Sequence, residues 1–237
     1  MKTKFIGHRG SLGFSVENTK VAFLGGVSRN VYGLECDIRI STDKVFFIMH
    51  DDTLNRFIPG DEKNVWEYSI NELLEKELVQ EFNGTTYFGK ICLLEEFINI
   101  CKNNNKHAII EIKYSPELSN ENVDMIHELI NLINKYEYLE NTTIISFQQD
   151  CLIKIRELYP NINIQLLVCG KILDYLEVCD KYNFDLDTCY DETVNKENVD
   201  LYHKHNHLIN IWTVDNKDDA DKLIEIRVDF ITSNLLS

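Results

Sequence analysis

Three acidic residues have the types and spacing of a buried metal site. Glu35 and Asp37 are two residues apart in an apolar run at 34–40, so on a strand they face the same side. Glu111 lies in another apolar run and is followed by Lys113. Unpaired carboxylates on buried strands are costly, and a cation between three of them removes their mutual repulsion. Oxygen ligands favour a hard divalent ion, Mg²⁺ or Ca²⁺, and salt bridges without a metal are the alternative.

Two basic residues lie next to these positions and could bind an anion. Arg9 follows the first apolar run of the chain, and Lys113 follows the run that contains Glu111. Arginine makes bidentate contacts to phosphate oxygens, and lysine supplies a point charge. The alternative pairs each of them with a nearby carboxylate, and both roles can hold at once.

Two histidines also directly follow apolar runs and could transfer protons. His8 and His50 occupy these positions. Cleavage of a phosphodiester needs one group to take a proton from the nucleophile and another to donate one to the leaving oxygen, and histidine suits both roles near neutral pH. A tight turn at residues 41–44 would place Glu35 opposite His50. A structural role is the commoner one for a lone histidine at a strand end, but two of them, followed by Arg9 and Asp51, favour chemistry.

Short apolar runs alternate with longer amphipathic segments, which predicts a parallel α/β sheet. Setting aside the run at 45–49 leaves eight strands, the number in a TIM (β/α)₈ barrel. A doubly wound sheet usually carries a glycine-rich phosphate loop after its first strand, and residues 7–10 do not form one. The expected strands lie at 4–7, 34–40, 108–112, 143–147, 164–168, 184–187, 209–214 and 229–232. The expected helices lie at 16–26, 93–103, 121–136, 149–158, 172–182, 196–205 and 217–226.

The domain organisation follows from what interrupts this alternation. No Pro-, Ser- or Gly-rich linker divides the 237 residues, so a single domain over 1–237 is expected. Residues 51–89 are polar and break the rhythm, which predicts a small insertion after the second strand, over one mouth of the barrel. In a TIM barrel the chemistry lies at the carboxyl ends of the strands, where the residues above would meet.

Composition limits the partners and the compartment. The formal net charge of −15 repels nucleic acid and anionic lipid head groups, so an anionic substrate needs local positive charge. No segment resembles a signal peptide or the ~18 apolar residues of a membrane span, which predicts a cytoplasmic protein without stable membrane insertion. The seven cysteines are odd in number and show no CxxC pair, so reduced core thiols are expected. The sequence does not predict an oligomeric state.

These residues resemble the motifs of the glycerophosphodiester phosphodiesterases. The resemblance covers nearly the whole chain, and its N-terminal set is highly specific. Its stretches are Gly7-His8-Arg9-Gly10, Glu17-Asn18-Thr19, Leu34-Glu35-Cys36-Asp37-Ile38, His50-Asp51-Asp52-Thr53-Leu54-Asn55-Arg56, Glu111-Ile112-Lys113, Ser146-Phe147 and Trp212-Thr213-Val214. The sequence departs from the usual pattern at Val16, Cys36 and Lys44, and in its last strand, which ends in Asn234 instead of Asp.

The resemblance implies a TIM barrel that hydrolyses glycerophosphodiesters to glycerol 3-phosphate and an alcohol. It implies one divalent cation, Mg²⁺ or Ca²⁺, and a small-molecule phosphodiester substrate. The implied roles are metal ligands for Glu35, Asp37 and Glu111, acid and base for His8 and His50, phosphate binding for Arg9 and Lys113, and pocket lining for Trp212. The alternatives are a lysophospholipase D or a cyclic-phosphate-forming enzyme on the same barrel, and a non-catalytic binding barrel.

Overall fold

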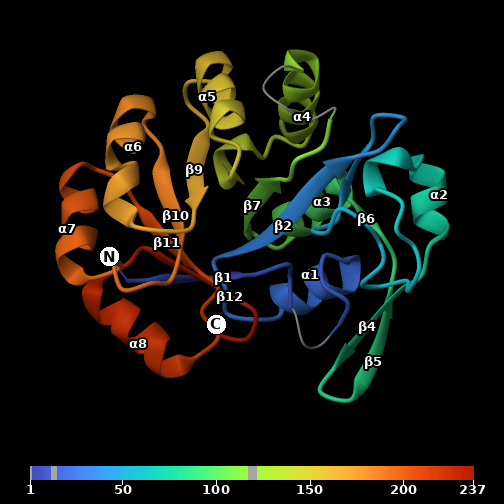
Figure 1. Ribbon diagram of the computed structural model, residues 1–237, viewed down its shortest axis with the longest axis horizontal. Helices are drawn as coiled ribbons and strands as arrows, with labels where there is room; N and C mark the ends of the chain where they lie inside the picture. The colour runs from blue at the N-terminus through green and yellow to red at the C-terminus, as the bar shows by residue number, and fades with distance from the viewer. Residues whose placement is uncertain (1, 12–14, 117–121) are drawn as a thin grey trace.

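Eight parallel strands close into a barrel in this computed structural model, which describes residues 2–11, 15–116 and 122–237 (Figure 1). Each barrel strand pairs with the next around the ring, and β1 closes the ring by pairing with both β12 and β2. The prediction of a TIM barrel is therefore confirmed. The barrel strands are β1 (Lys4–Gly7), β2 (Gly33–Ile40), β7 (His107–Ile112), β8 (Thr142–Ser146), β9 (Asn163–Val168), β10 (Asp185–Cys189), β11 (Ile209–Trp212) and β12 (Phe230–Ser233).

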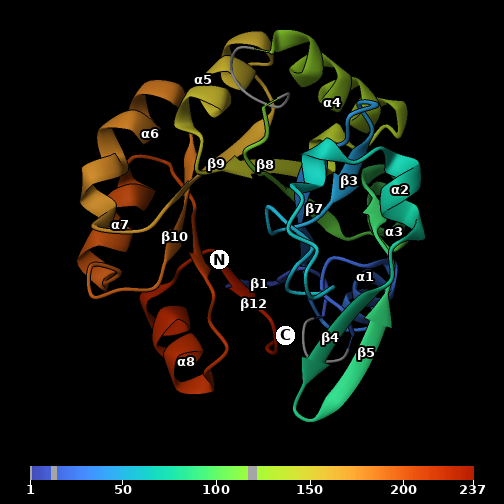
Figure 2. The same ribbon diagram turned by 45° about the vertical axis from the view of Figure 1, so that its right-hand side comes forward.

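Helices surround the barrel, as the two ribbon views show (Figures 1 and 2). No described helix has the length and apolar character needed to cross a bilayer. The first residue of the helix expected at 121–136 lies outside the described residues, and the segment expected at 172–182 divides into η3 (Ile172–Tyr175) and α6. The α-helices are α1 (Lys20–Val27), α2 (Ile70–Glu75), α3 (Leu94–Asn103), α4 (Val123–Lys135), α5 (Gln149–Leu158), α6 (Leu176–Tyr182), α7 (Lys196–Lys204) and α8 (Lys217–Ile226), and the 3₁₀-helix η2 (Leu139–Asn141) follows α4.

The first helix starts later than the sequence pattern predicted. Helix α1 begins at Lys20 because Thr19 caps it, its hydroxyl accepting a hydrogen bond from the backbone N–H of Ala22. Residues 16–19 therefore form a loop, in which Asn18 adopts a left-handed φ of 57°. This loop carries polar side chains toward the barrel end.

The apolar core of the barrel itself has two parts, one on each side of the barrel wall. The larger part lies between the strands and the surrounding helices. Because successive strand side chains face opposite sides, the other half of the residues point into the barrel. The interior apolar layer comprises Ile6, Ile109, Ile145 and Leu167, with Trp212 and Phe230 packed against it. The barrel is thus filled with side chains and not hollow.

The predicted insertion forms a small structure beside the barrel. The chain turns back after β2 as β3 (Phe46–Ile48), antiparallel to β2, and β6 (Cys92–Leu93) later pairs with β3. Between them lie η1 (Val65–Glu67), α2 and the hairpin of β4 (Leu78–Phe82) and β5 (Thr85–Gly89). The hairpin turn at Asn83-Gly84 has φ of 49° and 76°, and positive φ at both residues is what a type I′ turn requires. The insertion packs around its own apolar cluster.

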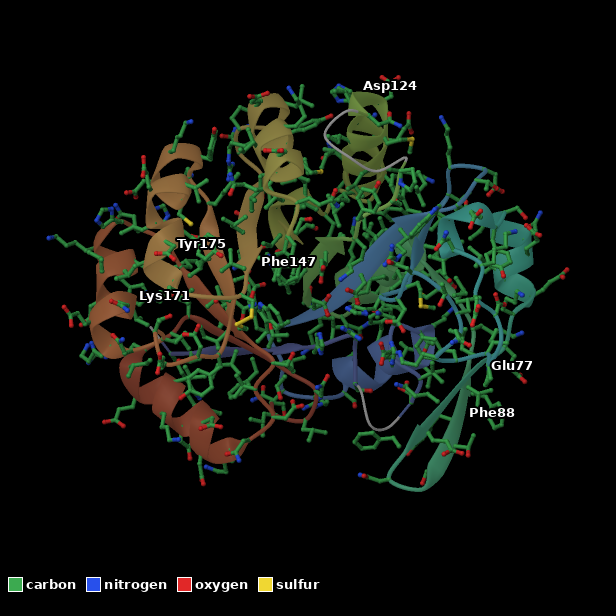
Figure 3. All side chains as sticks on the ribbon, in the orientation of Figure 1. Glu77, Phe88, Asp124, Phe147, Lys171 and Tyr175 are labelled. Carbon is green, nitrogen blue, oxygen red and sulfur yellow. A yellow bond between two sulfur atoms is a disulfide. The ribbon has the colours of Figure 1, made fainter. Side chains whose placement is uncertain are left out.

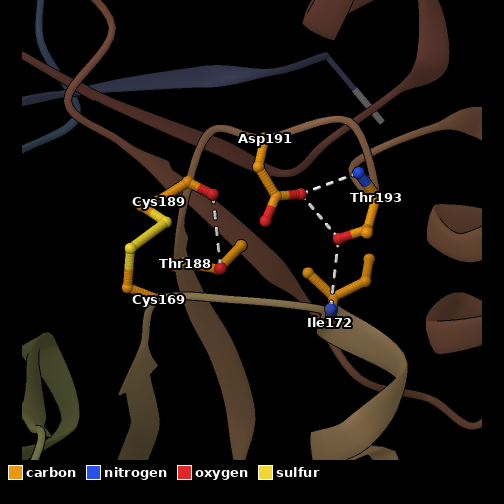
Figure 4. Close-up of a disulfide and its surroundings, with 6 residues drawn as sticks. All are labelled: Cys169, Ile172, Thr188, Cys189, Asp191 and Thr193. Atoms are coloured by element: carbon orange, nitrogen blue, oxygen red, sulfur yellow. Dashed lines mark hydrogen bonds between the residues drawn. A yellow bond between two sulfur atoms is a disulfide. The ribbon is translucent and has the colours of Figure 1, made fainter.

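The expectation of seven reduced cysteines was wrong for two of them. Cys169 and Cys189 form a disulfide with a Cα–Cα distance of 5.1 Å (Figure 4). Val168 pairs with Thr188 between β9 and β10, so the next residues are also neighbours on adjacent strands. This closeness depends on strand register and leaves no pattern in the sequence. The other cysteines, at positions 36, 92, 101, 151 and 179, are free and buried.

Candidate active site

The residues singled out from the sequence come together at the carboxyl ends of the barrel strands. Strands β1, β2 and β7 are neighbours in the sheet and position six of them. A cavity opens at this end. The predicted residues that line the cavity are His8, Arg9, Glu35, His50, Glu111, Lys113 and Trp212. Asp37 is buried beside them, with 1% of its surface exposed.

The three carboxylates of Glu35, Asp37 and Glu111 form one cluster. One oxygen atom from each lies within 4.8 Å of the others, and no other group of this kind occurs among the described residues. Oε1 of Glu35 and Oδ1 of Asp37 are buried and have no hydrogen-bond partner. Burial and the neighbouring carboxylates raise the pKa of Glu35 well above its usual value and that of Glu111 to about 8. These orphaned, mutually repelling oxygens fit a hard divalent cation.

Two basic side chains offset part of this negative charge. Nζ of Lys113 lies 2.8 Å from Oε1 of Glu111 and 3.8 Å from Oδ1 of Asp37. Nε of Arg9 lies 3.4 Å from Oδ2 of Asp37, and the backbone N–H of Arg9 donates to Glu35. Burial alone would raise the pKa of Asp37, but the positive charges around it hold that pKa at about 2. Arg9 and Lys113 therefore pair with carboxylates while lining the cavity.

His8 is held in one tautomer by a chain of hydrogen bonds. Its Nδ1 lies 2.8 Å from Oδ1 of Asn234, whose amide Nδ2 donates to Asp215. Because this fixes the Asn234 oxygen as the acceptor, Nδ1 of His8 carries the proton and Nε2 presents a lone pair. Nε2 lies 3.9 Å from Glu35. Burial, assisted by the charge of Arg9, lowers the pKa of His8, which favours the neutral ring.

The ring of His50 hydrogen-bonds to a carboxylate through one of its two nitrogens. Its Nδ1 is 2.7 Å from Oδ1 of Asp51, and Arg56 holds Asp51 through an Nε–Oδ2 contact of 2.6 Å. This leaves Nε2 of His50 available at the cavity. The negative charge of Asp51 offsets the positive charge that the ring carries when both nitrogens are protonated.

The register that brings His50 to the site differs by one residue from the predicted one. The backbone N–H of Ser41 donates to the carbonyl of Val45, and the backbone N–H of Val45 donates to the Ser41 hydroxyl. Lys44 closes the three-residue loop with a left-handed φ of 62°. Ile38 therefore lies opposite Ile48, and the backbone N–H of Met49 donates to Asp37. His50 consequently follows the residue opposite Asp37 and does not face Glu35.

Several site residues were not assigned a role from the sequence. Asn18 donates to Oδ2 of Asp37 at 2.7 Å, and Glu17 accepts from Arg9 and Arg56 at 2.7 Å each. The polar residues at 17–19 could have indicated a role in the site. The sequence pattern predicted a helix there, so it did not predict the loop that brings these side chains to β2. Arg56 comes from the insertion, and nothing in the spacing predicts that contact.

Glu17 provides a pH-dependent test of this network. Its side chain is almost fully buried, and although burial opposes the charge, Arg56 and Arg9 lower its pKa from 4.5 to about 2. The ionised group therefore adds stability above pH 4.5, and this stability is lost as the pH falls toward 2. We expect Glu17→Gln to lower the free energy of unfolding at pH 7 by on the order of 3 kcal/mol.

Urea denaturation at pH 7 and near pH 3 measures this difference between the variant and the wild type. The difference in the free energy of unfolding is smaller at the lower pH if Glu17 stabilises the fold through its charge. An equal difference at both pH values contradicts that role of Glu17. Glu157→Gln is the matched control, because Glu157 forms an exposed pair with Lys154, and it is expected to change stability by less than ~1 kcal/mol.

The rest of the cavity wall is mostly apolar. Trp212 and Phe147 meet edge to face with ring centroids 5.8 Å apart, and Phe147 is half exposed, near the middle of the ring of helices (Figure 3). Asp187 also lines this wall. Burial, with a smaller contribution from Glu111, raises the pKa of Asp187 well above its usual value.

Comparisons with known proteins identify the family and the fold of this chain. The model of the Glycerophosphoryl diester phosphodiesterase family matches residues 8–235. A glycerophosphodiester phosphodiesterase of Caldanaerobacter subterraneus subsp. tengcongensis is 27% identical over 99% of this chain and 95% of its own length. A putative glycerophosphoryl diester phosphodiesterase from Silicibacter pomeroyi has a TM-score of 0.88, with 20% identity over 99% of this chain and 90% of its own. An Oleispira antarctica phosphodiesterase, solved in complex with the product sn-glycerol-3-phosphate, has a TM-score of 0.84, with 21% identity over 98% of this chain and 93% of its own.

Proposed function

Since this chain belongs to the glycerophosphoryl diester phosphodiesterase family, we propose that it hydrolyses glycerophosphodiesters to glycerol 3-phosphate and an alcohol with the help of one divalent cation. The observation that carries the proposal is the meeting, around one cavity, of three buried carboxylates, two basic side chains and two histidines. A phosphodiester needs charge neutralisation, a base and an acid, and this cavity offers all three.

The three acidic residues are the proposed ligands of the cation. Glu35, Asp37 and Glu111 would hold Mg²⁺ or Ca²⁺, and the bound ion supplies positive charge that offsets the charge of the phosphate. Arg9 and Lys113 line the same cavity, and each can turn toward a bound phosphate while keeping a carboxylate partner. We assign them to stabilising the charge on the phosphoryl oxygens in the transition state.

The hydrogen bonds of the two histidines divide the proton transfers between them. His8 is the base, because its Nδ1 proton is committed to Asn234 and its Nε2 lone pair can take a proton from the attacking hydroxyl. His50 is the acid, because Asp51 supports its positive charge while Nε2 gives a proton to the departing alcohol. The bond from phosphorus to the alcohol oxygen breaks as the bond to the attacking oxygen forms.

Release of glycerol 3-phosphate from glycerophosphocholine tests the proposed activity directly. We expect release that EDTA abolishes and that added Mg²⁺ or Ca²⁺ restores. Phosphorus NMR of the products separates direct attack by water, which forms glycerol 3-phosphate at once, from a route through a cyclic phosphate. Folded protein that releases no glycerol 3-phosphate with either ion contradicts the proposal and directs the search to lysophospholipids.

A further inference from the structure

Asp187 is a buried acidic residue in the cavity that the proposed chemistry does not use. It lies on β10 with 1% of its surface exposed, and its Oδ1 atom has no hydrogen-bond partner. A buried polar atom without a partner costs on the order of 1–3 kcal/mol, so a partner is expected from outside the chain. Because Asp187 lines the cavity, a ligand bound there can supply that partner.

The strand order places Asp187 across the barrel from the acidic cluster. Four pairings separate β10 from β2 in either direction around the ring, so the two strands lie on opposite sides. A phosphate bound at the acidic cluster through the proposed cation, with Arg9 and Lys113 beside it, would therefore direct one of its ester groups toward β10. Leu167 on β9 is the register partner of Asp187, and it is buried and lines this side of the cavity, so we expect the group that enters to be small.

On the β11 side, the neighbours of Asp187 are polar and uncharged. Asn210 is its register partner on β11. Asn210 and Thr232 on β12 exchange hydrogen bonds, the Nδ2–Oγ1 distance being 2.9 Å. Three adjacent strands thus form a strip of donors and acceptors inside the barrel. Such a strip matches hydroxyl groups, each of which donates and accepts at once.

We propose that Asp187 accepts a hydrogen bond from a hydroxyl group of the glycerol moiety and so selects glycerol over alcohols that lack that hydroxyl. This inference rests on the proposed function and names the half of the substrate that enters the closed side of the cavity. The glycerol moiety is small and the same in every glycerophosphodiester, whereas the variable alcohol needs the open side. A quaternary head group such as choline has no N–H to donate to Oδ1.

Binding measurements test Asp187 without depending on turnover. Calorimetry would compare sn-glycerol 3-phosphate with two analogues, 3-hydroxypropyl phosphate and 2-hydroxypropyl phosphate, each lacking one hydroxyl, in the presence of Mg²⁺. We expect the wild type to prefer glycerol 3-phosphate over one analogue by on the order of tenfold to a hundredfold. Asp187→Leu should remove this preference by weakening the binding of glycerol 3-phosphate and of the analogue that keeps the contacted hydroxyl, while the other analogue binds as before. Asp187→Asn, which keeps an acceptor oxygen, should retain most of the preference.

Gln165→Leu is the matched control. Gln165 also points an unpartnered, buried oxygen into the barrel, but it lines a separate cavity with Ile6 and Thr143. Its replacement should leave the preference unchanged. A preference that survives Asp187→Leu, or a wild type that does not distinguish the three ligands, overturns the inference. Turnover of glycerophosphocholine by the wild type is measured separately. An active enzyme that lacks the binding preference contradicts the role of Asp187 but leaves the proposed function intact.

One further outcome also counts against the hydroxyl assignment. If Asp187→Leu changes the relative turnover of glycerophosphoethanolamine and glycerophosphoglycerol while the binding preference stays the same, Asp187 contacts the alcohol head group instead. If the hydroxyl assignment holds, the variant slows both substrates by the same factor, because both contain the same glycerol moiety.

Discussion

Replacing His8 or His50 by alanine is expected to lower turnover at least ~100-fold, the usual size of a lost acid or base contribution. Each histidine is fixed by one ring nitrogen, His8 through Asn234 and His50 through Asp51, so each has the other nitrogen free for proton transfer. Steady-state kinetics with glycerophosphocholine measure the effect. Circular dichroism and thermal unfolding show whether the variants keep the fold.

A substrate with a good leaving group separates the two roles. The p-nitrophenyl ester of glycerol 3-phosphate needs no proton on its departing oxygen, so His50→Ala should recover most of its rate on that substrate. His8→Ala should remain slow on both substrates, because the attacking hydroxyl still needs a base. His203→Ala is the control, since His203 pairs with Asp229 away from the cavity. A loss below tenfold on glycerophosphocholine removes that histidine from the mechanism. If His8→Ala, and not His50→Ala, recovers its rate on the p-nitrophenyl ester, His8 is the acid and His50 is the base.

Glu35→Gln is expected to abolish the effect of the divalent cation while making the metal-free protein more stable. The pKa of Glu35 is raised in the folded state by burial and by Asp37 and Glu111, so its charge costs stability above its unfolded pKa when no cation is bound. Glutamine keeps the shape and removes the charge. Turnover should fall at least ~100-fold, because the cation is then held by two carboxylates instead of three.

Thermal unfolding in EDTA and in added Mg²⁺ or Ca²⁺ gives a readout that does not depend on activity. The wild type should gain stability from one of these ions, since a ligand that binds only the folded state stabilises it. Glu35→Gln should unfold at a higher temperature than the wild type in EDTA, and the added ion should raise its unfolding temperature little. Glu62→Gln, at an exposed position of the insertion, is the control and should behave as the wild type does. A variant that keeps the full response to the ion shows that Glu35 is not a ligand.

The sequence alone contained the fold class and much of the site. Strand and helix periods are local properties, so the alternation of apolar runs predicted the barrel. The same local period put Glu35 and Asp37 on one face of β2, and both side chains do lie in one cluster with Glu111. The position of His8 directly after β1 was likewise visible, because the carboxyl end of a strand is a local feature of the chain.

Only the tertiary structure decided which distant residues meet. Asp37 and Glu111 are register partners because β2 pairs with β7 across the entire insertion, and Cys169 reaches Cys189 for the same kind of reason. The contact of Arg56 with Glu17 and the place of Asp187 opposite β2 also depend on how the barrel closes. The spacing of residues along the chain determines the face of its own strand on which each side chain lies. The register between strands comes from packing and closure of the whole barrel, and no short pattern encodes it.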